Sequence, residues 1–344
     1  MTRTNRELKL IFAVIVALFA VFLAGPILLL LGKSLWDGGL TGVFYASVLS
    51  RKGFLPALGN SFAVAGASAA AATVLAFLLA YGVHYTGLPR WGKGLITSVA
   101  TLPMFLPTIT YGFAIIYSFG KQGLLTRLLG RQLFDIYGFF GLMVGYVIYT
   151  IPVAFLLIHN TMGFVDKKTF TVSKVMGDRV LATFWIAVLR PLLGTFAGAF
   201  IQAFFLCFTD FGIPASVGGG YEVIATLLYD QMLGGIPDFN RGAVIAMMML
   251  IPSIGSICIL QLLERFNIRY SRISHAELRK NTLRDVGWGA SNAAISVGIL
   301  AVFAVIVVVP LVEEWPYQTG FSLEHFRTVL SDSSLLCLLY TSPS

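Results

Sequence analysis

The sequence predicts an all-α protein, a polytopic bundle of about seven transmembrane helices. Three observations predict this fold class: hydrophobic residues make up 57% of the 344 residues, charged residues make up only 12%, and the mean hydropathy is +0.83. The apolar residues are gathered in long runs, which is typical of membrane proteins and not of soluble domains. The residues behind the net charge of +8 lie between these runs. They therefore indicate lipid headgroups and membrane orientation, and not nucleic acid.

Seven runs are long enough to cross a bilayer, because about 20 helical residues span its ~30 Å hydrocarbon core. The first has a basic front like a signal peptide, but it is long and ends without a small-residue cleavage site, so we expect it to remain as an anchor. With a cytoplasmic N-terminus, the inner segments hold roughly twice as many Lys and Arg residues as the outer ones, as the positive-inside rule requires. The predicted spans are Leu10–Leu31, Ser61–Tyr81, Leu95–Phe119, Phe139–Ile158, Pro191–Phe211, Ala243–Leu263 and Ala293–Val312.

The third span contains two prolines, Pro103 and Pro107. Each removes a backbone donor from the helix, so a break or kink is predicted here. Such a kink is tolerated where neighbouring helices or a water-filled path satisfy the freed carbonyls. It is therefore either structural or part of a solute pathway.

A polar stretch, VDKKTFTVSKVMGDRVLATFWIAVLRP, separates the fourth and fifth spans at Val165–Pro191. Asp166 can cap a first helix, Gly177 can turn the backbone at its end, and Asp178 can cap a second helix. Helical spacing gives this stretch one apolar stripe, formed by Val172, Val175, Met176 and Val180. The pattern fits a cytoplasmic docking element, and it also fits an amphipathic helix lying on the membrane surface.

A second unusual stretch, FTDFGIPASVGGGYEVIATLLYD, follows the fifth span at Phe208–Asp230. Asp210 is an acid near a membrane helix end, where a charge must be solvated or paired. It is either a solvated helix-end acid or a contact for solute. The glycines and Pro214 predict a turn or re-entrant element, and a short helix is predicted over Val223–Tyr229.

These two stretches resemble, respectively, the "EAA" coupling loop of ABC importer permeases and the outer segment of the ferric-iron and aminoethylphosphonate types. The resemblance implies a type I (MetI-like) permease fold in the inner membrane, a dimer of cytoplasmic ATPases, and a periplasmic or extracellular solute-binding protein. It assigns ATPase coupling to Val172, Lys174, Val175, Met176, Gly177, Asp178 and Arg179. The candidate residues for the pathway or outer gate are Pro103 and Pro107, from the kink in the third span, and Asp210, Gly212, Pro214, Gly218 and Gly219, from the second stretch. The motif's Glu-Ala-Ala falls on Thr171-Val172-Ser173. Thr171 can keep a hydrogen bond to the ATPase, but it lacks the charge of the usual glutamate.

Motifs for catalysis and metal binding are missing from the sequence: the four histidines are isolated, and no HExxH or GxSxG pattern occurs. We therefore expect a transport permease that is not an enzyme and has no cofactor of its own, with ATP bound by partner subunits. The alternative is a secondary transporter or channel that needs no ATPase, which would require ionisable relays within its spans. The resemblance leaves the solute open among iron, phosphonate, polyamine and thiamine.

The end of the sequence repeats its beginning. Pro310 ends a span as Pro26 does, and FSLEHFRTVL at 321–330 matches LTGVFYASVL at 40–49. We expect residues 1–275 to form a first permease half and 276–344 to begin a second, in a fused form. The alternative is a six-span permease with an extra anchor that works as a homodimer. Residues 337–344, CLLYTSPS, resemble the read-through of a sequencing adaptor. We also expect the seventh span to lack most of its intended neighbours.

Overall fold

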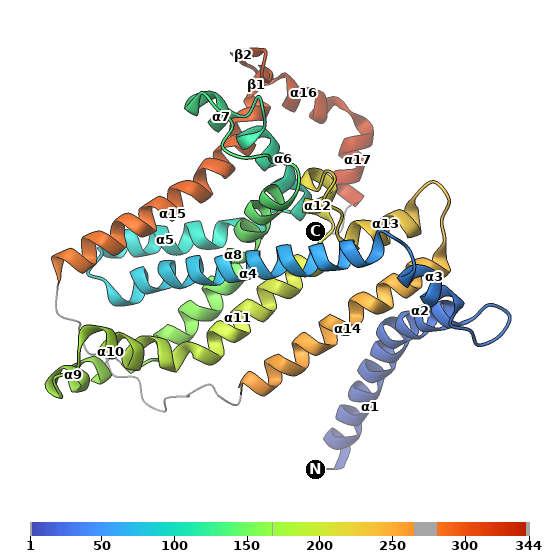
Figure 1. The fold of residues 1–344 in the computed structure, drawn as a ribbon, viewed down its shortest axis with the longest axis horizontal. Helices are drawn as coiled ribbons and strands as arrows, with labels where there is room; N and C mark the ends of the chain where they lie inside the picture. Colours follow the sequence, from blue (N-terminus) through green and yellow to red (C-terminus); the bar gives the residue numbers. More distant parts are fainter. Residues whose placement is uncertain (1, 167, 265–280, 342–344) are drawn as a thin grey trace. The chain divides into compact units, whose positions relative to one another are not determined.

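The computed structural model describes residues 2–166, 168–264 and 281–341 (Figure 1). Most of them are helical. The elements are α1 (Thr2–Phe19), α2 (Gly25–Leu35), α3 (Val43–Leu49), α4 (Phe54–Tyr85), α5 (Arg90–Thr101), α6 (Thr108–Phe119), α7 (Leu124–Leu129), α8 (Phe139–Gly163), α9 (Lys168–Val175), α10 (Val180–Phe184), α11 (Arg190–Thr209), α12 (Gly212–Val217), α13 (Ile224–Leu233), α14 (Phe239–Glu264), α15 (Thr282–Val308), the antiparallel hairpin β1 (Val312–Glu314) and β2 (Gln318–Phe321), α16 (Glu324–Ser331) and α17 (Ser333–Thr341).

The helices confirm the predicted polytopic fold class. Within the described residues, six helices are long and apolar enough to cross a membrane, and a bent pair of helices would make a seventh. The six are Glu7–Leu35, Phe54–Tyr85, Phe139–Gly163, Val180–Thr209, Phe239–Leu263 and Thr282–Leu311. Most extend beyond the predicted bounds, because the helices continue past the apolar run that the hydropathy detects.

The third predicted span is the bent pair. Arg90–Phe105 and Thr108–Leu129 meet at an angle of 110°. Leu106 and Pro107 between them have extended backbone, which a proline at this point favours. The hydroxyl of the buried Tyr111 donates to the carbonyl of Pro103, which also accepts from the backbone N–H of Leu106 (3.3 Å). The predicted break at the two prolines is confirmed.

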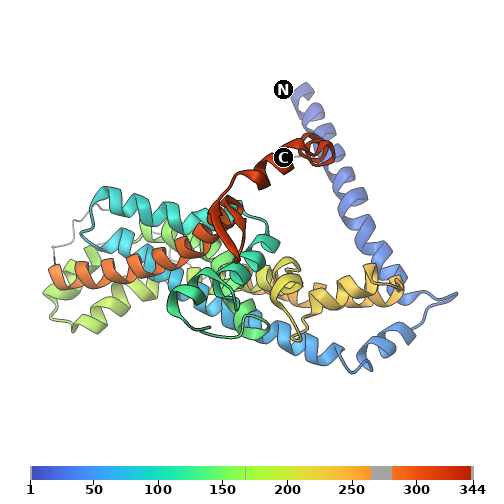
Figure 2. The ribbon, with the colours of Figure 1, turned by 90° about the horizontal axis from the view of Figure 1, so that it is seen from above.

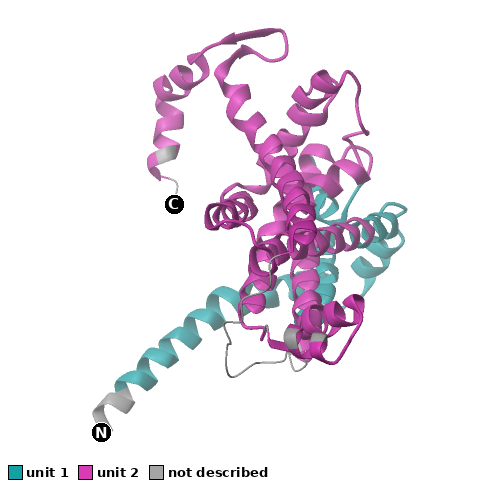
Figure 3. Ribbon diagram, turned by 90° about the vertical axis from the view of Figure 1, so that its left-hand side faces the viewer, with its two compact units in different colours: residues 1–62, 222–258 teal, residues 63–221, 259–344 magenta. Residues whose placement is uncertain are grey.

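The chain forms two compact units, coloured separately in Figure 3. The first consists of residues 1–62 and 222–258. In it the start of α13 is fixed to α4, because the backbone N–H of Ile224 donates to the Ser61 hydroxyl (2.8 Å) and the Asn60 amide donates to the carbonyl of Glu222 (2.9 Å). The candidate span Glu7–Leu35 is apolar, and its most apolar window has no buried residue among those the structure describes.

The second unit, residues 63–221 and 259–344, contains the main hydrophobic cluster, built from α4, α5, α8 and α11. Its fully buried side chains include Leu79, Phe155 and Ile158. Gly145 of α8 permits close packing, because a Cβ there would lie 2.8 Å from the Ile213 side chain of α12. In Figures 1 and 2, α9 and α10 lie at one end of these helices, and α7 with β1–β2 lies away from that end.

The seventh span, α15, packs along α5 and α6 with one face. Asn292, Ile299 and Val302 on this face are buried, whereas Val297 and Val307 on the other face are exposed. Only 22% of the most apolar window of this span is buried, and the expectation that it lacks neighbours from a second half stays a prediction.

The expected internal repeat has a structural counterpart. In the first copy, α2 is followed by an isolated antiparallel bridge between Trp36 and Leu40 and then by α3. In the second, α15 is followed by β1–β2 and then by α16. The proposed boundary between the halves, at residues 275 and 276, lies outside the described residues, so the division itself stays a prediction.

Candidate functional site

The stretch between the fourth and fifth spans forms two short helices joined by a tight turn. The Asp166 carboxylate accepts from the backbone N–H of Lys168 (2.9 Å), so the predicted cap of α9 is confirmed. Gly177 has a φ of +80°, the left-handed conformation that ends many helices. The backbone N–H of Asp178 then donates to the carbonyl of Ser173 (3.1 Å), which closes the turn.

The predicted role of Asp178 as a helix cap was wrong. Its carboxylate accepts from the hydroxyl of Ser173 (2.5 Å), which also lies 3.0 Å from the hydroxyl of Thr183. Helix α10 begins at Val180 after Arg179, and among the described residues no side chain caps it. Ser173 is buried between the two helices and competes for the carboxylate. These bonds tie α9 to α10 across the turn.

The outward face of this helix pair is apolar. Val175, Met176 and Val180 are 82%, 74% and 85% exposed, and Val172 and Leu181 are exposed beside them. The predicted stripe is therefore confirmed as an exposed surface. An apolar patch held on a rigid turn is suited to contact with another protein or with lipid. The side chain of Lys174 lies outside the described part of the chain.

The second helix of the pair continues into the membrane. Residues Val180–Thr209 form one candidate span, in which Trp185–Leu189 is a π-helical turn. Pro191 follows this turn and has no N–H to donate to the preceding carbonyls, which accounts for the locally widened helix. The turn does not interrupt the helix, so α10 and α11 are continuous.

Asp210 lies at the end of α11, with only 9% of its surface exposed. Its carboxylate accepts from the backbone N–H of Ile213 (3.0 Å) and from the side chain of Thr108. Burial raises the pKa of Asp210 above its ordinary value, although these hydrogen bonds act in the opposite direction. Asp210 is thus a buried group that fixes α12 to the break in the third span, and the interpretation as a solvated acid was wrong.

Glycines allow α12 to approach α6 closely. A Cβ at Gly212 would meet Thr108 and lie 2.6 Å from the backbone nitrogen of Ile109. A Cβ at Gly112 of α6 would overlap the Ser216 side chain of α12. The predicted pathway residues of the third span and of the outer segment are therefore neighbours in space.

The turn after α12 is confirmed as well. The N–H of Gly218 donates to the carbonyl of Pro214 (2.8 Å), and Gly219 has a φ of +56°. A Cβ on Gly219 would lie 2.9 Å from the Tyr137 side chain, so the turn packs against the loop before α8. The following helix, α13, extends four residues beyond the predicted end at Tyr229, to Leu233.

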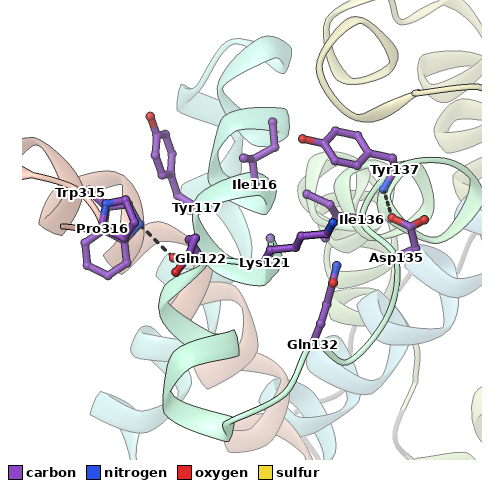
Figure 4. A pocket seen from close by; sticks show the side chains of 11 residues that line it. Ile116, Tyr117, Lys121, Gln122, Gln132, Asp135, Ile136, Tyr137, Trp315 and Pro316 are labelled. Atoms are coloured by element: carbon purple, nitrogen blue, oxygen red, sulfur yellow. Dashed lines mark hydrogen bonds between the residues drawn. The ribbon is translucent and has the colours of Figure 1, made fainter.

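A cavity of about 330 Å³ lies between the end of α6, the loop before α8 and the β1–β2 hairpin (Figure 4). Its wall is partly aromatic, through Tyr117, Tyr137 and Trp315. The hairpin is held there because the Trp315 ring N–H donates to the carbonyl of Gln122 (3.2 Å) and the Arg127 guanidinium donates to the carbonyl of Pro316 (3.0 Å). This cavity could not be predicted from the sequence, because its two sides are far apart in the chain.

Two further features were missed. His84 and His159, which were interpreted as isolated, lie with ring nitrogens 3.1 Å apart between α4 and α8. An aromatic row on α4, Phe77, Tyr81 and Tyr85, follows helical spacing and could have been noticed in the sequence.

No known family profile matches the chain. The ferric transport system permease protein FbpB 1 of Haemophilus influenzae is 24% identical over 271 residues, which are 77% of this chain and 42% of that protein. The thiamine transport system permease protein ThiP of Escherichia coli is 25% identical over 60% of this chain and 39% of its own. The spermidine/putrescine permease PotC homolog of Mycoplasma pneumoniae is 25% identical over 42% of this chain and 48% of its own. The chain thus spans less than half the length of these relatives.

The fold has a solved counterpart in a bacterial alginate ABC transporter, crystallised in complex with an alginate-bound periplasmic protein. The TM-score is 0.62 at 12% identity, over 79% of this chain and 97% of the matched one. At this identity the likeness shows the fold, and it confirms the predicted helical permease architecture. In sequence and in fold, the chain is therefore related to the permeases of ABC importers, with ferric, thiamine and polyamine transport permeases among its relatives.

Proposed function

We propose that the chain is a permease of a binding-protein-dependent ABC importer and that its stretch 165–190 couples the solute pathway to ATPase subunits. One observation carries the proposal: an exposed apolar helix pair, closed by a left-handed glycine, is continuous with a membrane-spanning helix. A force applied to this patch would reach the membrane without passing through a flexible linker. A surface-lying amphipathic helix would not require that connection.

The proposed orientation places the N-terminus and α9–α10 in the cytoplasm, on the basis of the Lys and Arg bias. A dimer of ATPase subunits would dock on α9–α10 and would bind the ATP, so this chain needs no cofactor. The solute-binding protein would dock outside, at the end that carries α7 and the β1–β2 hairpin. This part of the chain contains the aromatic cavity of Figure 4, a surface suited to a protein partner.

The proposed pathway runs beside the break of the third span, where Asp210 and Thr108 meet. Ferric iron is the first solute to test, because the ferric permease relative aligns over more of the chain than the thiamine or polyamine permeases do. Residues 1–275 would form one half of the permease and 276–344 the start of a second, as the repeated order of helix, β connection and short helix supports.

The test uses the full chain reconstituted in proteoliposomes with its ATPase and binding protein. Val175→Glu places a charge in the exposed patch, and Leu128→Glu places the same charge on an equally apolar exposed site of α7, 74% exposed, as the matched control. Val175→Glu is expected to abolish copurification of the ATPase and ATP-dependent uptake, while Leu128→Glu, at the end proposed for the binding protein, retains copurification of the ATPase. Uptake that continues without ATP would instead support an ATPase-independent transporter.

A further inference from the structure

The aromatic row of α4 lies at the junction between the coupling helices and the membrane bundle. Phe77, Tyr81 and Tyr85 are spaced four residues apart and therefore share one helix face. Their ring centroids follow each other at 5.9 Å and 5.1 Å. Tyr81 and Tyr85 are almost completely buried, at 6% and 1% exposure. The row is thus a continuous aromatic surface inside the second unit.

Both α9 and α10 contact this row, each through a partly buried phenylalanine. Phe170 of α9 lies 5.5 Å from Tyr85, and Phe184 of α10 lies 5.8 Å from Tyr81. Phe184 also meets Phe77 edge-on at 6.3 Å. Edge-to-face and tilted aromatic pairs at these distances are favourable beyond their buried area. The position of the helix pair is therefore set by α4 as well as by its covalent continuation into α11.

The seventh span reaches the same row from another side. The Trp288 ring of α15 lies 4.2 Å from Tyr81, centroid to centroid, and 6.5 Å from Phe77. Tyr81 is consequently in contact with Phe184 and with Trp288 at once. It is the shared neighbour of α10 and α15.

Two close approaches fix α15 in register beside this row. The Asn292 amide donates to the carbonyls of Trp288 (2.7 Å) and Leu78 (3.2 Å), and a Cβ at Gly82 would lie 2.5 Å from that amide. Nearer the inner end, a Cβ at Gly87 would lie 2.6 Å from the Asp285 carboxylate. A slip of α15 by one residue would break the bond from Asn292 to Leu78 and move Trp288 away from Tyr81.

We propose that Tyr81 and Trp288 are positioning residues for the coupling helices, so that α15 holds α9 and α10 in place through the aromatic row. The functional consequence of this inference rests on the proposed function. If α9 and α10 are displaced during coupling, the displacement is transmitted to α15 as well as to α11. Since α15 begins the second copy of the internal repeat, the row would join the coupling element of one half to the first span of the next.

Backbone hydrogen exchange of residues 168–184, measured on the full chain in nanodiscs, tests the positioning without any ATPase. Trp288→Ala and Tyr81→Leu are expected to speed exchange in this segment on the order of tenfold, the effect of losing about 1.4 kcal/mol of local stability. Trp288→Phe keeps an aromatic ring in place and is expected to stay within about twofold of the unmodified chain. Phe303→Ala, on the same helix but packed near Tyr111, is the matched control and should leave the segment unchanged.

Unchanged exchange in both Trp288→Ala and Tyr81→Leu would overturn the proposal. Equal acceleration by Phe303→Ala would also overturn it, because it would show general loosening of α15. The ATPase measurement is made separately in proteoliposomes, where Trp288→Ala is expected to lower transport-coupled stimulation and Trp288→Phe to restore it. Absent ATPase stimulation in the unmodified chain would refute the proposed function while leaving the exchange result intact.

Discussion

Substitutions of Gly177 can distinguish two roles of this position: its left-handed backbone conformation and its place on the surface proposed to contact the ATPase. Gly177 has a φ of +80°, and within the described part of the chain no atom lies within 4 Å of a Cβ built there. The side chain of an alanine would therefore meet open space, and the cost would come from the left-handed backbone alone. That cost is about 1–2 kcal/mol for a non-glycine residue. It corresponds to a shift of the turn's equilibrium by a factor of about 5–30.

Three variants resolve the two effects. Gly177→Asn is expected to remain close to the unmodified chain, because asparagine adopts the left-handed conformation more readily than other residues. Gly177→Ala should carry the backbone cost only, and exchange at residues 168–184 should quicken by the factor above. Gly177→Leu carries the same backbone cost and adds a bulky group to the surface proposed for the ATPase, so it should also lose coupled uptake.

The assay compares membrane insertion, ATPase stimulation and uptake in proteoliposomes. All three variants are expected to insert normally, because the turn lies outside the membrane spans. If Gly177→Leu supports normal uptake and normal ATPase stimulation, α9–α10 is a surface-lying element and the coupling interpretation fails. If Gly177→Asn is as impaired as Gly177→Ala, the left-handed turn is not the cause.

Three other predictions follow from the packing. In an otherwise cysteine-free chain, Val175→Cys should react with an impermeant maleimide in inverted vesicles only; reaction in sealed cells would reverse the proposed orientation. Because burial raises the pKa of Asp210, its contribution to stability is fully present below the unfolded pKa and is lost as pH rises through the folded pKa. Asp210→Asn should therefore be more stable than the unmodified chain at pH 8, with the gap closing in acid, as followed by thermal unfolding; an equal gap at every pH would contradict this. Gly82→Ala should cost about 1–3 kcal/mol by overpacking against Asn292, and Asn292→Ala in the same chain should recover part of the loss in melting temperature.

Predictions from the sequence were confirmed where a single local property of the chain determines the structure. Long apolar runs predicted the spans, and prolines predicted the break in the third, because a missing N–H has the same effect in any surroundings. The turn at Gly177 was predicted correctly for a similar reason, since glycine adopts a positive φ without a steric penalty. The 110° angle at the break was not predictable, because it depends on Tyr111 and on the packing of α12.

Errors arose where two groups compete for one partner or where distant segments meet. Asp178 was expected to cap a helix, but the nearby Ser173 hydroxyl takes its carboxylate. Asp210 was interpreted as either a solvated acid or a solute contact, and its burial was not predicted because its contact with Thr108 joins residues about a hundred positions apart. Trp288 gave no signal, since its partner Tyr81 is still farther away in the chain. Such contacts depend on the tertiary fold, which a single sequence does not display.

Helix α10 continues into α11 without interruption, so a tilt at one end of this helix displaces its other end. Its 30 residues correspond to a rod of about 45 Å. A tilt of about 5° at the coupling end would move the other end by roughly 4 Å, more than the length of a hydrogen bond. Asp210 directly follows that far end, and its bond to the backbone of Ile213 is 3.0 Å long. A small rotation at the α10 end is therefore large enough to pull this carboxylate out of its contacts at the other end of the helix.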